Sequence, residues 1–91
     1  MAKIDIRRKH AGSLKAAKAA VDKTAKAIGK KFAISSEWEG DTLHFQRSGV
    51  DGHIHVSKAE VHVYVELGFL LGMMQPMIEA EIKKQLDENF G

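Results

Sequence analysis

The sequence predicts a small α+β domain, a two-layer sandwich in which two helices cover one face of a mostly antiparallel sheet. Two observations lead to this fold class. Apolar residues recur at steps of three or four in two separate segments, which is the spacing of amphipathic helices. Between those segments, apolar and polar residues alternate in four stretches joined by tight turns, as in strands with one buried face. A chain of 91 residues has room for one such domain, over residues 1–91.

The first two elements are a short strand and a long helix. Residues 3–8 alternate, with their isoleucines on one side. Ser13 is a good N-cap for the helix that follows, which we expect to run from Leu14 to about Lys31. Gly29 lies near its end, and we expect it to fray or close the helix. The apolar stripe of this helix consists of Leu14, Ala17, Val21, Ala25, Ile28 and Phe32.

Four strands follow, at residues 33–39, 42–48, 52–57 and 61–67. We expect two-residue turns between them, and we expect Trp38 to pack between the sheet and the helices. The first strand has a place at either edge of the sheet, and we favour the edge beside residues 61–67, which resembles the curled sheet of small helix-grip folds. The whole order is then β-α-β-β-β-β-α. The expected turns are Gly40-Asp41, Gly49-Val50 and Lys58-Ala59.

The last element is a helix with Pro76 in its first turn and an apolar stripe of Ile78, Ile82 and Leu86. The joint before it is the most apolar stretch of the chain. If Leu67 points into the core, a segment crossing from sheet to helix cannot bury both of its sides. Core packing in a monomer is the simpler interpretation of these side chains. The stretch is long for one joint, however, so we expect part of it to contact a partner or a granule, or to form a symmetric homodimer. The residues concerned are Phe69, Leu70, Leu71, Met73, Met74 and Met77.

Histidines gather on the polar face of the predicted sheet. With two-residue turns, one row across four strands reads Glu37, His44, His55 and His62, and the next reads Ser35, Gln46, His53 and Tyr64. Imidazoles and a carboxylate at that spacing are candidate ligands of a divalent metal. A solvated sheet face that uses histidine is the simpler interpretation, because flat sheet sites converge poorly. Adjacent histidines would also oppose each other's protonation.

Charge is distributed unevenly along the chain. Residues 1–31 hold ten Lys/Arg and two Asp, whereas residues 32–91 hold four Lys/Arg and ten Asp/Glu. An anionic partner should therefore meet the first strand and helix, although a solvated helix face is the simpler interpretation of the lysines. Nucleic acid is disfavoured, because no aromatic residues are interleaved with the lysines. The candidate anion contacts are Arg7, Arg8, Lys9, Lys15 and Lys18.

Several classes of protein are excluded or disfavoured by composition. The chain has no cysteine, which rules out a disulfide scaffold, a thiol nucleophile and thiolate metal sites. It has no glycine-rich phosphate loop and no evident pairing of a nucleophile with a base, so we expect a non-enzymatic protein without a cofactor. No apolar run reaches the length of a membrane span and no signal peptide opens the chain, so we expect a cytoplasmic location.

Two segments, WEGDTLHFQRSGVDGHIHV and ELGFLLGMMQPMIEAEIKKQLDENF, resemble the small polyhydroxyalkanoic acid system proteins of bacteria. The most telling pieces are Trp38-Glu39-Gly40-Asp41, Phe45 through Gly49-Val50 with Gly52, Leu67-Gly68 with Leu70-Leu71, and the terminal Ile82, Leu86-Asp87 and Phe90. The resemblance covers nearly the whole chain and supplies no catalytic residues. It implies an accessory role in the metabolism of a carbon-storage polyester, at or near storage granules.

Two alternatives from other classes remain at this stage. A curved sheet gripped by helices can leave a pocket for an acyl chain, as in a small lipid carrier. The histidine row or the lysine helix can instead serve a metal- or nucleic-acid-binding module. Bound lipid, metal content or salt-dependent retention on DNA would distinguish these alternatives from the accessory role.

Overall fold

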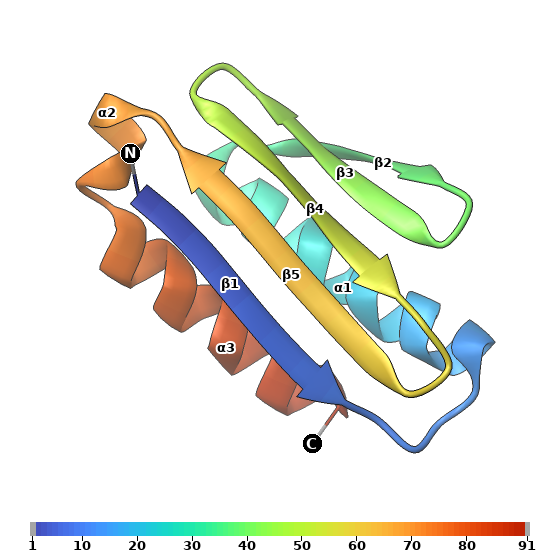
Figure 1. Cartoon of the computed structure of the whole chain (residues 1–91). Coiled ribbons are helices and arrows are strands. Elements are labelled where there is room, and N and C mark those ends of the chain that lie inside the picture. Colours follow the sequence, from blue (N-terminus) through green and yellow to red (C-terminus); the bar gives the residue numbers. More distant parts are fainter. Residues whose placement is uncertain (1, 91) are drawn as a thin grey trace.

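A computed structural model describes residues 2–90, apart from the side chain of Leu70 (Figure 1). Five strands and two long helices form an α+β fold, so the expected class is confirmed. A four-residue helix inside the apolar joint was not expected. The elements are β1 (Ala2–Lys9), α1 (Leu14–Phe32), β2 (Ser35–Glu39), β3 (Thr42–Arg47), β4 (Val50–Val56), β5 (Glu60–Leu67), α2 (Phe69–Gly72) and α3 (Gln75–Phe90).

The five strands form one sheet in the order β1-β5-β4-β3-β2, and every neighbouring pair is antiparallel. The expected position of β1 beside β5 is confirmed, with Ala2 opposite Leu67 and Lys9 opposite Glu60. The helices α1 and α3 lie on one face of this sheet (Figure 1). The other face is left open, so the sheet has one buried side and one solvated side.

The core lies between the sheet and the helices. Alternate strand residues point inward, and Leu67 is among them with no exposed surface. They meet one stripe of α1 and the stripe of Ile78, Ile82 and Leu86 on α3. The layers are closely packed: the apolar gap among Ile28, Phe45 and their neighbours is about 10 Å³, which is room for one water molecule.

The end of α1 depends on a glycine inside the helix. Gly29 does not fray the helix, which continues to Phe32. Ala33 then adopts a left-handed conformation with φ of 56°, and the Ile34 amide donates to the Gly29 carbonyl at 3.0 Å. The chain turns back so closely that a Cβ at position 29 would collide with the Ile34 carbonyl oxygen. Gly29 is therefore required by the close approach of the backbone.

The turn between β3 and β4 differs from the expected one. Arg47 lies opposite Val50, so the turn residues are Ser48 and Gly49 rather than Gly49 and Val50. Gly49 has φ of 85°, which glycine adopts without strain, and its carbonyl accepts a hydrogen bond from the Gly68 amide at 2.7 Å. The physical reason for the shift is burial. It places the Val50 side chain in the core, where it is 7% exposed.

Trp38 lies at the edge of the core and is only half-buried. Its indole Nε1 donates to Asp22 Oδ1 at 3.2 Å, and Lys18 Nζ lies 5.0 Å from the centre of its ring. The tryptophan therefore packs against the polar flank of α1 as well as the apolar stripe. The hydrogen bonds that Asp22 accepts, from Lys26 first and Trp38 second, lower the pKa of its carboxyl.

Polar contacts join the two long helices. Thr24 of α1 is fully buried, donates to the Ala20 carbonyl at 3.0 Å, and accepts from Asn89 Nδ2 of α3 at 3.1 Å. Lys31 donates to Glu81 Oε1 of α3 at 2.7 Å. This hydrogen bond from Lys31, followed by one from Gln85, lowers the pKa of Glu81.

Candidate functional site

The apolar joint exposes large side chains at one end of the molecule. Phe69 is 85% exposed, Met73 78% and Met77 59%. Leu71 and Met74 are partly buried and pack against the core. We call these five residues the apolar cluster. The side chain of Leu70, which was expected to join them, lies outside the described part of the structure.

Local backbone contacts hold the apolar cluster in place. After β5 the chain leaves the end of the sheet, and the Gly72 amide closes a turn onto the Gly68 carbonyl at 2.7 Å. The short helix α2 lies beside the start of β1 (Figure 1). A shallow hollow lies here, between Phe69 and Met73 on one side and Ala2 on the other. Apolar patches of this kind are typical contact surfaces for an apolar partner.

The histidines lie on the open face of the sheet, but the expected row is wrong. Glu37 does face His44, and His55 does face His62. His44, however, faces His53 rather than His55, because the β3–β4 turn is displaced. One row across the sheet therefore reads Glu37, His44, His53, Tyr64 and Asp5, and the next reads Glu39, Thr42, His55, His62 and Arg7.

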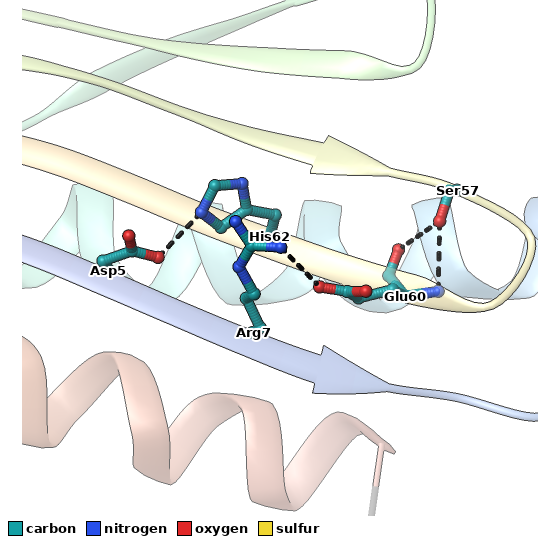
Figure 2. Close-up of polar contacts among 5 residues, drawn as sticks. All are labelled: Asp5, Arg7, Ser57, Glu60 and His62. Carbon is teal, nitrogen blue, oxygen red and sulfur yellow. Dashed lines mark hydrogen bonds and ion pairs between the residues drawn. The ribbon is translucent and has the colours of Figure 1, made fainter.

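The side chains of these rows are held mainly by hydrogen bonds to neighbours (Figure 2). His62 Nε2 donates to Asp5 Oδ1 at 2.7 Å, and Arg7 forms an ion pair with Glu60 at 3.7 Å. Thr42 Oγ1 and His55 Nδ1 are hydrogen bonded at 2.9 Å. Asp5 and Thr42 are thus hydrogen bonded to ring nitrogens of His62 and His55, which are two of the four candidate metal ligands.

The placement of these side chains does not favour metal binding. Glu37 and His44 lie in one row while His55 and His62 lie in the other, so the four expected ligands do not converge. Within residues 2–90, no three histidine, aspartate or glutamate side chains are grouped so that they could hold a metal ion. The neighbouring rings of His44, His53 and His62 have centroids 6.3 and 6.4 Å apart.

A tyrosine completes the open face. Tyr64 lies beside His53 with ring centroids 5.9 Å apart, and its hydroxyl donates to Glu66 Oε1 at 2.7 Å. This hydrogen bond raises the pKa of the Tyr64 hydroxyl, because the bond favours the protonated form and the carboxylate repels a phenolate. The face is therefore a hydrogen-bonded polar surface at neutral pH.

The five candidate anion contacts are spread over different parts of the molecule. Arg7 points to the open face and pairs with Glu60, whereas Arg8 pairs with Asp87 of α3. Lys18 pairs with Asp41 at 3.3 Å and donates to the Gly40 carbonyl at 3.0 Å. Lys9 and Lys15 are both exposed. These residues therefore do not form one site.

Some organising contacts were not foreseen from the sequence. The pairing of His62 with Asp5 joins the last strand of the chain to the first, and only the β1–β5 register places them together. His10 Nε2 likewise donates to the Ser57 carbonyl at 2.7 Å. Such contacts carry no local sequence signal, although the expected β1–β5 pairing limits the choices.

The comparisons with known proteins give one match. A family model described as "Putative polyhydroxyalkanoic acid system protein" matches residues 4–90. No curated protein and no solved structure matches the chain. Among the described residues, no helix is both long enough and apolar enough to cross a membrane.

Proposed function

The chain belongs to the family of polyhydroxyalkanoic acid system proteins, and from this premise we propose that it is a non-enzymatic accessory protein that contacts the storage granule through the apolar cluster. The polymer of such a granule is a hydrophobic polyester. A protein that attaches to it needs apolar side chains that are exposed before contact and buried afterwards. The proposal places this protein at storage granules.

The exposure of Phe69, Met73 and Met77 supports this proposal most directly. These are the large hydrophobic side chains that the described structure leaves exposed, and all three lie at one end of the molecule. An aromatic side chain can bury about 150–250 Å². At about 25 cal/mol per Å², half-burial of Phe69 against the polyester contributes about 2 kcal/mol to attachment.

An acyl carrier is the weaker candidate. Such a carrier needs an interior pocket of several hundred cubic ångströms to cover a fatty chain. The gap between sheet and helices here has a volume of about 10 Å³, which is far too small for such a chain. A closely packed interior is consistent with a protein that attaches to an apolar surface, and it leaves no space in which to enclose an acyl chain.

We also propose that the apolar cluster forms a two-fold homodimer when no granule is present. A two-fold contact lets one patch cover its own copy, which removes Phe69 and Met73 from water without a second complementary surface. The same side chains cannot contact the polyester and the partner subunit at once. Dimerisation and granule attachment are therefore in competition.

The direct test measures binding of the purified protein to amorphous polyhydroxyalkanoate particles. The double variant Phe69→Ser, Met73→Ser should bind about thirtyfold or more weakly, which corresponds to the loss of about 2 kcal/mol. The control variant Ala16→Ser, Ala19→Ser changes exposed residues of α1 and should bind like the wild type. In granule-producing cells, tagged wild-type protein should sediment with the granules. A wild-type protein absent from that fraction would contradict the proposal.

A further inference from the structure

A line of lysines follows the side of α1 that points away from the sheet. These are Lys15, Lys23, Lys26 and Lys30, all exposed. Steps of three, four, seven and eight residues keep side chains on one side of a helix, and the buried stripe of α1 lies on the opposite side. At 1.5 Å per residue the line is about 22 Å long. We call it the basic ridge.

The lysines of α1 differ in their partners. Lys18, Lys26 and Lys31 form ion pairs with Asp41, Asp22 and Glu81. Within residues 2–90, no carboxylate lies within ion-pair distance of the other lysines on the ridge. Their charge is therefore not neutralised within the described structure, and it remains available to an external anion. These three are Lys15, Lys23 and Lys30.

Small side chains lie between and beside the lysines of the ridge. Ala16 and Ala19 are exposed between the lysines, and Ala27 is partly exposed. Alanine side chains are short and do not obstruct the approach of a flat partner surface to the helix. Several lysine ammonium groups can therefore contact such a surface together. A flat, extended anionic surface fits this shape better than a small ion does.

The opposite side of the molecule carries the opposite charge. Strand alternation and register place six carboxylates and three basic side chains on or beside the open face of the sheet. They are Asp5, Glu37, Glu39, Asp51, Glu60 and Glu66 against Lys3, Arg7 and Lys9. An anionic surface therefore attracts the α1 side and repels the sheet side, which orients the molecule as it approaches.

From the ridge and this two-sided charge we propose that α1 docks the protein on an anionic lipid surface, with the open face of the sheet turned away. Lysine ammonium groups act as point charges that suit diffuse lipid headgroups. A nucleic acid is a poorer fit, since the ridge has no arginine for bidentate contacts to bases and no aromatic side chain for stacking. This docking surface is separate from the apolar cluster and does not depend on the proposed granule contact.

The test is co-sedimentation of the full chain with vesicles of phosphatidylglycerol and phosphatidylcholine in equal parts. The variant Lys15→Gln, Lys23→Gln, Lys30→Gln should bind about a hundredfold more weakly, since one lysine near an anionic bilayer is worth about a fivefold change in affinity. Pure phosphatidylcholine vesicles should retain neither protein. Binding should also be lost at about 0.5 M salt, where screening shortens the Debye length to about 4 Å.

The matched control is the variant Lys3→Gln, Lys9→Gln, Lys58→Gln. It removes the same three charges from exposed positions on the open face and the β4–β5 turn. This control should bind anionic vesicles about as tightly as the wild type, because the ridge is intact and the altered residues lie on the side turned away from the bilayer, where salt screens their charge. Equal losses in the two variants would overturn the proposal, because the effect would then follow net charge rather than the ridge.

Two further outcomes would also overturn it. The first is wild-type binding to duplex DNA that is as tight as binding to the vesicles and depends equally on the ridge lysines. The second is vesicle binding that survives in the ridge variant but is lost in Phe69→Ser, Met73→Ser, which would assign the lipid contact to the apolar cluster. The particle assay without lipid tests the granule proposal separately, so failures of the two proposals are distinguishable.

Discussion

Ala33 holds the one left-handed backbone conformation that the described non-glycine residues adopt. Residues with a Cβ are strained there by about 1 kcal/mol, although the position is needed to end α1 and return the chain to β2. Ala33→Gly should therefore raise the free energy of unfolding by up to about 1 kcal/mol, or the melting temperature by about 4–8 °C.

The matched variant is Gly40→Ala. Gly40 has φ of 63° and open space around its Cβ position, so this change adds the same backbone strain without a collision. It should lower stability by about 1 kcal/mol. Urea unfolding of both variants measures the two shifts, and opposite signs are required. A destabilised Ala33→Gly protein would show that the loss of conformational entropy dominates.

Trp38 ties β2 to the polar flank of α1. Since its indole is half-buried, Trp38→Ala should cost about 2 kcal/mol in urea unfolding rather than the 3–5 kcal/mol of a fully buried tryptophan. Trp38→Phe keeps a ring but removes the hydrogen bond to Asp22. The pKa of Asp22 should then rise toward its ordinary value, which NMR titration of the carboxyl measures. An unchanged Asp22 pKa would contradict the role assigned to the indole.

Zinc should not stabilise the folded protein through the four histidines of the open face. If these residues formed a zinc site, free zinc at a hundred times its dissociation constant would add about 2.7 kcal/mol to the free energy of unfolding. We expect no such rise in thermal melts with added zinc, because Glu37 and His44 lie in one row and His55 and His62 in the other, while Thr42 and Asp5 already hydrogen bond to His55 and His62. A clear rise that disappears in His55→Ala would establish a metal site despite this geometry.

At the scale of elements, the contact between Lys31 and Glu81 joins α1 to α3 and makes their packing depend on pH. The pKa of Glu81 is lowered in the folded protein, mainly by the hydrogen bond from Lys31. The resulting stability is fully present above the ordinary carboxyl pKa of about 4.3 and is lost as pH falls through the lower folded value. The urea concentration at the unfolding midpoint should therefore decrease as the pH is lowered below about 4.

The variant Lys31→Gln isolates this contribution. It should be less stable than the wild type at neutral pH, and it should lose less stability on acidification because the pKa of Glu81 returns toward normal. Lys58→Gln, at an exposed turn, should leave the acid profile unchanged. Parallel acid profiles of the wild type and Lys31→Gln would contradict the assigned role of the pair.

The elements themselves could be predicted because one face of each strand and one stripe of each long helix are buried. The turn between β3 and β4 could not, since Ser48-Gly49 and Gly49-Val50 both offer a turn glycine. Burial of Val50 by residues distant in sequence decides between them. The four residues of α2 are too few to show a helical period.

The functional surfaces were predictable to different degrees. An apolar stretch too long for one joint indicated exposed side chains before the structure located Phe69, Met73 and Met77. The anion contacts were less predictable. The carboxylates that pair with Arg7, Arg8 and Lys18 come from distant elements, so local charge density did not reveal which basic groups lack partners.

At the scale of the whole molecule, the apolar cluster should decide the oligomeric state. We expect the wild type to sediment as a dimer at micromolar concentration and Phe69→Glu, Met73→Glu to sediment as a monomer, because a buried carboxylate without a partner opposes the two-fold contact. Lys58→Glu should leave the dimer intact. A wild-type monomer, unaffected by either variant, would remove the dimer proposal.

The place of β1 in the sheet also has a consequence for biosynthesis. The ribosome makes β1 first, but the partner of β1 is β5, so that Ile4 and Ile6 pair with Val65 and Val63. Until β5 has left the exit tunnel, β1 has no strand partner on either side and the side chains of Ile4 and Ile6 lack their cover, and such unpaired strands aggregate or recruit chaperones. Completion of the sheet therefore has to wait until translation has passed residue 67, and a message truncated before β5 would yield a chain that cannot cover its first strand.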